Sequence, residues 1–157
     1  MFNLRSLGTL VLILSISVFF LGGCAPMKLN VMPEKTVLTP ELLEKPLKFA
    51  GTGFKPNEVV TIELVVPKGI KMKGLGEGED RVGVAVANAD DKGNFEVAMA
   101  AMSTLTNLFQ VGWTSTMTPD FKEAKPLPAG RYDILATGVD SDKKAKGILE
   151  ILPPPQK

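Results

Sequence analysis

Short rows that alternate apolar and polar residues recur along residues 59–152 and indicate a β-rich chain. Alternation with a period of two places every second side chain on the same face of a strand. Turn-forming residues separate the rows, as in antiparallel sheets. We therefore expect an all-β antiparallel sandwich. The predicted apolar faces are Val60, Ile62, Leu64 and Val66; Val82, Val84 and Val86; Phe95, Val97 and Met99; Tyr132, Ile134 and Ala136; and Ala145, Gly147, Leu149 and Ile151.

Two stretches break the alternation. Residues 99–112 place Met99, Met102, Leu105 and Phe109 at helical spacing, which predicts a short one-faced helical insertion around residues 99–110. A strand that continues into the opposite sheet is the competing interpretation. Residues 70–81 are rich in glycine and charge and are typical of a mobile loop.

The N-terminal segment has the pattern of a secretion signal. Arg5 is followed by an uncharged apolar run over residues 7–21. That run is shorter than the roughly 20 residues that a helix needs to cross a bilayer. Its length and its basic flank favour the apolar region of a signal peptide that spans residues 1–23.

Leu21-Gly22-Gly23-Cys24 resembles the lipobox of bacterial lipoproteins. The resemblance implies cleavage before Cys24 and attachment of fatty acyl chains such as palmitate to this residue and to the new N-terminus. Two or three acyl chains suffice for stable anchoring. We therefore expect the membrane to be a partner through Cys24 and the protein to lie in the bacterial cell envelope. Ala25 resembles the residue that directs lipoproteins to the outer membrane, where one exists; otherwise we expect the outer face of the cell membrane.

Proline marks both ends of the expected domain. Residues 24–45 hold Pro26, Pro33 and Pro40, which exclude a long helix and indicate a tether with a first strand around residues 35–38. The sandwich is expected over residues 46–152. Residues 153–157 form a Pro-rich tail.

Segments within residues 46–152 resemble bacterial immunoglobulin-like modules. Residues 50–58, AGTGFKPNE, resemble the signature G-x-G-F-x-P-G-E, with Asn57 where the family has Gly. Both residue types tolerate a positive φ. The resemblance implies an immunoglobulin-like antiparallel β-sandwich in which Tyr132 forms a tyrosine corner, its hydroxyl bonded to upstream backbone. The alternative for Tyr132 is an ordinary residue at the edge of the core.

The amino-acid composition argues against several kinds of function. The sequence has no histidine, the commonest general base and transition-metal ligand, and its only cysteine is Cys24. After removal of the signal peptide with Arg5, as many Lys and Arg remain as there are Asp and Glu, namely 17. We therefore expect no enzyme activity, no cofactor, no metal site and no nucleic-acid partner.

Aromatic residues and methionine recur at every fourth position in residues 109–121. Phe109, Trp113, Met117 and Phe121 stand among Thr and Ser residues, and we consider them a candidate binding patch. Such side chains are enriched at contact surfaces. The alternative is that they cover the open end of the sandwich.

These features favour a membrane-anchored envelope lipoprotein with a non-catalytic binding or structural role. Its partner would be an envelope protein, a glycan or a lipid, recognised by loops 70–81 and 100–125 on a rigid scaffold. The alternative function is a carrier or sensor of an apolar ligand, held in a pocket beside the inserted helix. Its lining would be Met99, Met102, Leu105, Phe109 and Trp113. A hydrolase, the third class, lacks an activating histidine.

The lipobox leads to a prediction about Cys24. We expect native protein to carry the mass of acyl chains on a chain that begins at Cys24, and to partition into the detergent-rich phase of Triton X-114. Cys24→Ser removes the only sulfur to which the lipid can attach, so this variant should carry no acyl mass. Produced without residues 1–23, it should stay in the aqueous phase. Intact-mass spectrometry checks both forms. Native material with the mass of the unprocessed chain and a free thiol would contradict the assignment.

Overall fold

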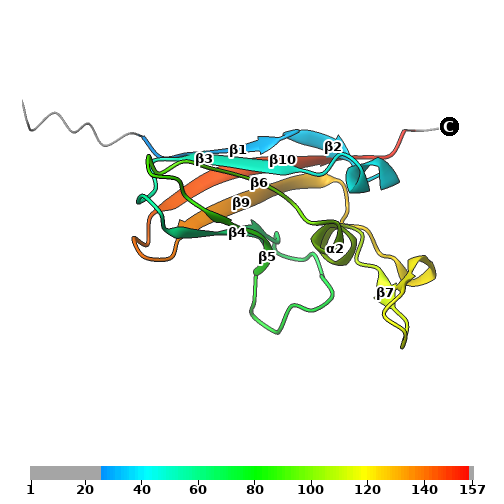
Figure 1. Cartoon of the computed structure of the whole chain (residues 1–157). Coiled ribbons are helices and arrows are strands. Elements are labelled where there is room, and N and C mark those ends of the chain that lie inside the picture. The colour runs from blue at the N-terminus through cyan, green and yellow to red at the C-terminus, as the bar shows by residue number, and fades with distance from the viewer. Residues whose placement is uncertain (1–25, 156–157) are drawn as a thin grey trace, which may run out of the picture.

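The computed structural model describes residues 26–155, which form a β-rich domain with short helical segments (Figure 1). The signal peptide and Cys24 lie outside the described residues. The strands are β1 (Lys28–Met32), β2 (Lys35–Val37), β3 (Lys48–Thr52), β4 (Val59–Val65), β5 (Arg81–Asn88), β6 (Phe95–Ala98), β7 (Gly112–Trp113), β8 (Pro119–Asp120), β9 (Gly130–Gly138) and β10 (Lys144–Leu152). The helical segments are η2 (Pro40–Leu43), α2 (Ala101–Ser103), η3 (Thr104–Leu108) and η4 (Phe121–Glu123). The all-β class is confirmed.

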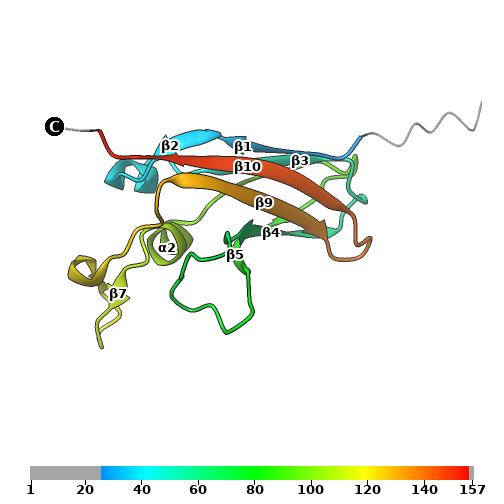
Figure 2. The same cartoon turned by 180° about the vertical axis from the view of Figure 1, so that it is seen from behind.

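The strands form two main sheets and one small hairpin. One sheet has the order β1-β3-β6 and the other the order β2-β10-β9-β4-β5, while β7 pairs with β8. All pairings are antiparallel except that of β2 with β10. Seen from behind, β1 runs along β10 (Figure 2). A Cβ at Gly147 of β10 would meet the side chains of Leu29 and Val31. The core lies between the two sheets.

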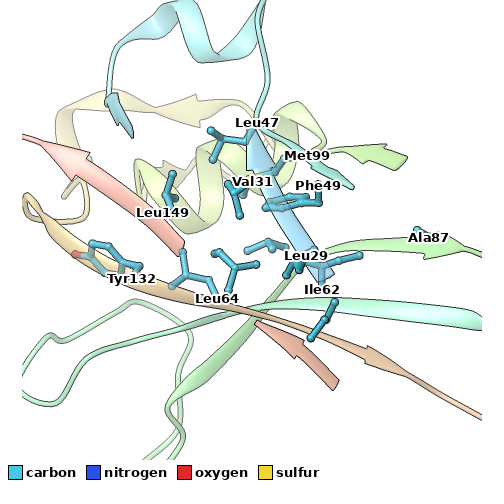
Figure 3. Close-up of a cluster of buried hydrophobic side chains, with 14 of the residues drawn as sticks. Leu29, Val31, Leu47, Phe49, Ile62, Leu64, Ala87, Met99, Tyr132 and Leu149 are labelled. Atoms are coloured by element: carbon cyan, nitrogen blue, oxygen red, sulfur yellow. The ribbon is translucent and has the colours of Figure 1, made fainter. Parts of the chain in front are cut away.

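Of the five alternating rows predicted from the sequence, four turn their apolar side chains into the core as expected. Every second residue of β4, β9 and β10 is buried, and Ile62, Ile134 and Leu149 are fully enclosed. Phe49 and Leu29 meet them from the opposite sheet (Figure 3). Burial of apolar surface is the main favourable term in folding, so this shared core holds the two sheets together.

Strand β5 departs from the predicted alternation. Val82 and Val84 turn inward, but Val86 is 62% exposed and Ala87 is buried instead. The pairing register with β4 shifts between Ile62 and Glu63. Such a β-bulge inserts one residue and so reverses the faces beyond it. The prediction that Val86 faces the core is therefore wrong.

The helical insertion is confirmed, but its buried face agrees with the predicted one only in part. Thr104, Asn107 and Leu108 are buried, whereas Met102 is 57% exposed. The Phe109 N–H donates to the Thr104 carbonyl at 3.1 Å, an i→i+5 bond that makes η3 a π-type turn. A π-type turn advances the chain by a different angle per residue than an α-helix does. The 3.6-residue spacing therefore places Met102 wrongly, although Met99 is buried and Phe109 packs against the core as predicted.

The segment expected to be a tether contributes to the domain. Strand β2 lies at the expected first strand, and β1 precedes it. Leu29 and Val31 of β1 are buried in the core. The folded body therefore begins near residue 28, a few residues after Cys24.

Tyr132 is fully buried near the start of β9, and its hydroxyl donates to the Pro128 carbonyl at 2.8 Å. Burial raises the pKa of this phenol. The hydrogen bond to upstream backbone is the one that the tyrosine-corner interpretation predicts. It fixes the entry of the chain into β9.

We expect Tyr132→Phe to lower the free energy of unfolding by about 1 kcal/mol, because it removes this hydrogen bond and keeps the ring. Urea unfolding followed by Trp113 fluorescence measures the change. Met117→Leu, at an exposed position, serves as the control and should be neutral. An unchanged midpoint for Tyr132→Phe would show that the hydroxyl contributes nothing.

Candidate functional site

The loops of the domain gather at two opposite ends. Residue 26 enters at one end, together with the turns at 53–58, 89–94 and 139–143. The loop 66–80, the helical insertion and the β7–β8 hairpin lie toward the other end (Figures 1 and 2). We call this second region the free end.

A small hairpin projects from the free end. Trp113 of β7 pairs with Pro119 of β8, and the Thr114 N–H donates to the Thr118 carbonyl at 3.0 Å. The hydroxyls of Thr114 and Thr116 also lie 3.0 Å apart. Met117 sits in the turn with a φ of 59° and is 74% exposed. These bonds define the hairpin and leave an apolar side chain at its tip.

The four residues of the candidate patch are divided by the structure. Phe109 is partly buried and packs against the core. Trp113 is half-buried in β7, while Met117 and Phe121 are exposed, the latter to 61%. Phe109 thus covers the core, and the other three belong to the hairpin and the turn that follows it.

Gln110 joins the two loops of the free end. It is buried, and its φ of 47° is unusual for a residue other than glycine. Its Oε1 accepts from the Lys73 N–H at 2.7 Å, and its Nε2 donates to the Lys125 carbonyl at 2.8 Å. One side chain therefore bonds to backbone on both sides, and loops that are distant in sequence form one surface.

Further contacts fix the loop 66–80 at its middle. Met72 is buried in the core cluster, and the Lys73 Nζ donates to the Glu123 carbonyl at 3.2 Å. On the other side, the Leu127 N–H donates to the Leu108 carbonyl at 2.8 Å. The loop that the sequence indicates as mobile is thus tied down near Met72 and Lys73.

A cavity of about 320 Å³ lies where these two loops meet. Lys71, Lys73 and Lys125 contribute to its walls, together with the buried Gln110. Within residues 26–155, the ion pairs involve other basic side chains than these three lysines. The cavity is therefore a basic one. Its full lining is Lys71, Met72, Lys73, Gln110, Lys125, Pro126 and Pro128.

The pocket expected for an apolar ligand is not formed by the predicted residues. Met99 is enclosed in the core, while Met102 points into solvent. A cavity of about 400 Å³ does lie beside the helix, between β5 and β6. Its lining is Gly83, Val84, Ala85, Val86, Val97, Ala98, Ala100 and Ser103.

The acidic turn at residues 90–96 is a hairpin turn. Asp90 Oδ1 accepts from the N–H groups of Asn94 at 2.8 Å and Lys92 at 2.9 Å. These bonds hold the pKa of Asp90 below its usual range. Among the described residues, no three His, Cys, Asp or Glu side chains gather in a way that would hold a metal ion.

Glu58 is a buried carboxylate at the end opposite the free end. It accepts from the Lys55 N–H at 2.5 Å and from the N–H and hydroxyl of Ser141 at 3.0 and 2.9 Å. Gly138 leaves room for it, since a Cβ there would lie 2.5 Å from Glu58 Oε1. Burial by itself raises the pKa of Glu58, but these hydrogen bonds outweigh it and hold the pKa below 4.5. Glu58 thereby fastens the turn at residues 55–58 to the β9–β10 turn.

Sequence reasoning did not single out Glu58 or Gln110. The only sequence signal for Glu58 is its place in the signature at residues 50–58, where Asn57 takes the expected positive φ, 61°. Gln110 has no local signal, because its partners lie at residues 73 and 125.

The chain has little similarity to known proteins in the comparisons made by sequence and by structure. No protein-family model and no curated protein matches the sequence. Among solved structures, the chain is similar to BslA, described as a bacterial hydrophobin, with 15% identity and a TM-score of 0.38 over 86% of this chain and 100% of that one. In residues 26–155 there is no helix of the length and apolarity needed to cross a membrane.

The Glu58 contacts lead to a pH prediction. A carboxyl with a lowered pKa adds stability that is complete above its ordinary pKa and is lost as the pH falls through the lowered value. Glu58→Gln removes the charge and turns an amide N–H₂ toward N–H donors. We expect it to cost about 1–3 kcal/mol at pH 7, and the difference from wild type should shrink below pH 4.5.

Urea unfolding between pH 3 and pH 7 measures this difference. Glu44→Gln, at an exposed position, is the matched control and should change stability by less than about 0.5 kcal/mol. An equal gap between wild type and Glu58→Gln at pH 3 and pH 7 would contradict the prediction.

Proposed function

We propose that this protein is an envelope lipoprotein, acylated at Cys24, whose immunoglobulin-like domain binds another envelope component through its free end. The role is non-catalytic. The partner is a protein, a glycan or a lipid of the envelope. The observation that carries the proposal is the surface at the free end, where Gln110 joins two loops beside the exposed Met117 and Phe121.

The strand order supports an immunoglobulin-like fold. Immunoglobulin domains pack a sheet that contains strands A, B and E against one that contains C, F and G, joined by Greek-key connections. Here β1, β3 and β6 stand for A, B and E, and β4, β9 and β10 for C, F and G, with β5 beside C. The Tyr132 hydrogen bond at the start of the F-like strand agrees with this assignment.

The position of the N-terminus supports an orientation in which the free end points away from the membrane. Cys24 lies only two positions before the first described residue, so a lipid on it would hold the end at which residue 26 enters. The hairpin and the loop 66–80 then face away from the anchoring membrane. Large exposed apolar side chains are typical of contact surfaces when they gather at one place.

The polar groups of the other end support a structural rather than a chemical role. Ser141 lies three residues before Lys144, the spacing of serine–lysine hydrolases, but its hydroxyl donates to Glu58. Glu58 is in turn saturated with donors. Neither group is free to act as a nucleophile or a base.

Site-specific photocrosslinking in intact envelopes tests the proposal. A photoreactive phenylalanine analogue at Met117 or Phe121 should give specific crosslinked products that mass spectrometry identifies. Val139 is the matched control, because it is 60% exposed and apolar but lies in the turn after β9. Crosslinks from Val139 alone, or from none of the three positions, would overturn the proposal.

A lipid titration distinguishes the proposed binding role from the alternative, a carrier of an apolar ligand. Trp113 is the only tryptophan of the chain, so its fluorescence reports one place. If the carrier alternative does not hold, brominated fatty acid should not quench the Trp113 fluorescence in a saturable way. Saturation at one ligand per chain would favour a carrier.

A further inference from the structure

The basic cavity of the free end has an excess of positive charge that the protein does not neutralise. Lys71, Lys73 and Lys125 line it, and no Asp or Glu does. Glu123, in the same segment as Lys125, packs its carboxylate against Gly112 of β7. The Lys73 ammonium already donates to the Glu123 carbonyl, and Lys71 and Lys125 are exposed, so the three side chains surround the cavity with net positive charge. A bound anion would offset the repulsion between these charges.

We propose that this cavity binds a phosphate group of an envelope ligand. Lysine ammonium groups bind phosphate as point charges, and three of them suit a group that carries more than one negative charge. The proposal rests on the binding role proposed above and names the chemistry that the free end recognises.

Gln110 makes the cavity a built site rather than a chance gathering of lysines. It is held in a strained backbone conformation, and such strain persists where the surrounding structure enforces it. Its two hydrogen bonds fix the backbone of Lys73 and of Lys125, so two of the three lysines start from fixed positions. A site whose walls are held in advance binds more tightly, because less freedom is lost on binding.

The rest of the lining indicates what is attached to the phosphate. Met72, Pro126 and Pro128 provide an apolar wall beside the lysines. The volume of about 320 Å³ lies at the lower end of the range for small-molecule sites, roughly 300–1,000 Å³. A phosphate that carries a short organic group, such as a glycerol or a sugar, fits this combination.

Isothermal titration calorimetry with glycerol 3-phosphate tests the proposal on purified protein that begins at residue 24 and carries Cys24→Ser, so that it has neither the apolar run 7–21 nor the sulfur for a lipid. We expect saturable binding at one site per chain. Lys71→Ala or Lys125→Ala should weaken it about threefold, which is the typical effect of losing one exposed ion pair. The double variant should weaken it about tenfold. Lys92→Ala, in the turn at 89–94, is the matched control and should bind like wild type.

The variant Gln110→Asn tests whether binding depends on a preformed site or only on the general attraction of anions by the lysines. Asn tolerates a positive φ and keeps the net charge, but its shorter side chain does not reach both Lys73 and Lys125. We expect weaker binding with an unchanged fold, checked by circular dichroism. Wild-type affinity in Gln110→Asn, or equal loss in Lys92→Ala and Lys71→Ala, would overturn the proposal.

Two further probes distinguish the source of the phosphate. Binding to phosphatidylglycerol vesicles but not to phosphatidylcholine vesicles, lost in the double lysine variant, would point to a lipid headgroup; binding to glycerol 3-phosphate alone would point to a soluble or glycan phosphate. Equal affinity for acetate would overturn the assignment to phosphate. A failure of these titrations together with specific crosslinks from Met117 would reject the phosphate site and leave the proposed function standing.

Discussion

The structure depends on one shared core, into which the long strands β4, β9 and β10 turn every second side chain. The apolar face of a sheet is stable only when it is buried against another layer, which here is the second sheet. Here β4, β9 and β10 meet β1 and β3 across the core, with Ile62 and Phe49 among the enclosed residues. Since the strands run between the two ends of the domain, the connections collect at these ends, and function has to be sought there.

Each end is fastened by one buried polar side chain. Glu58 gathers donors from the turn at 55–58 and from Ser141, and Gln110 bonds to the backbone at Lys73 and Lys125. A buried polar group that lacks partners costs stability, whereas a satisfied one specifies a unique arrangement. The two ends nevertheless differ, because the Gln110 end exposes both Met117 and Phe121 on the hairpin and the turn after it, whereas the turn at the Glu58 end exposes the smaller Val139. This difference is the reason to look for a partner at the free end.

The sequence predicts the strands well and the helical insertion less well. Rows such as Val60, Ile62 and Leu64 alternate in the sequence as they do in the structure, since the period of a strand is set by the backbone alone. The orientations of Met102 and of Val86 are predicted wrongly. A π-type turn and a β-bulge change the local period. The bulge forms in the pairing of β5 with β4, and the π-type turn through the i→i+5 bond within η3.

The candidate site is predictable only in part. The aromatic pattern at residues 109–121 leads to the hairpin, but it does not separate Phe109, which packs on the core, from Phe121, which is exposed. Local sequence alone determined the β class, the turns and the residues that resemble a lipobox at Cys24. Tertiary structure decided the partners of Glu58 and Gln110 and the meeting of the three lysines in one cavity. The physical reason is that these contacts join residues far apart along the chain, and a periodic pattern carries no information about distant partners.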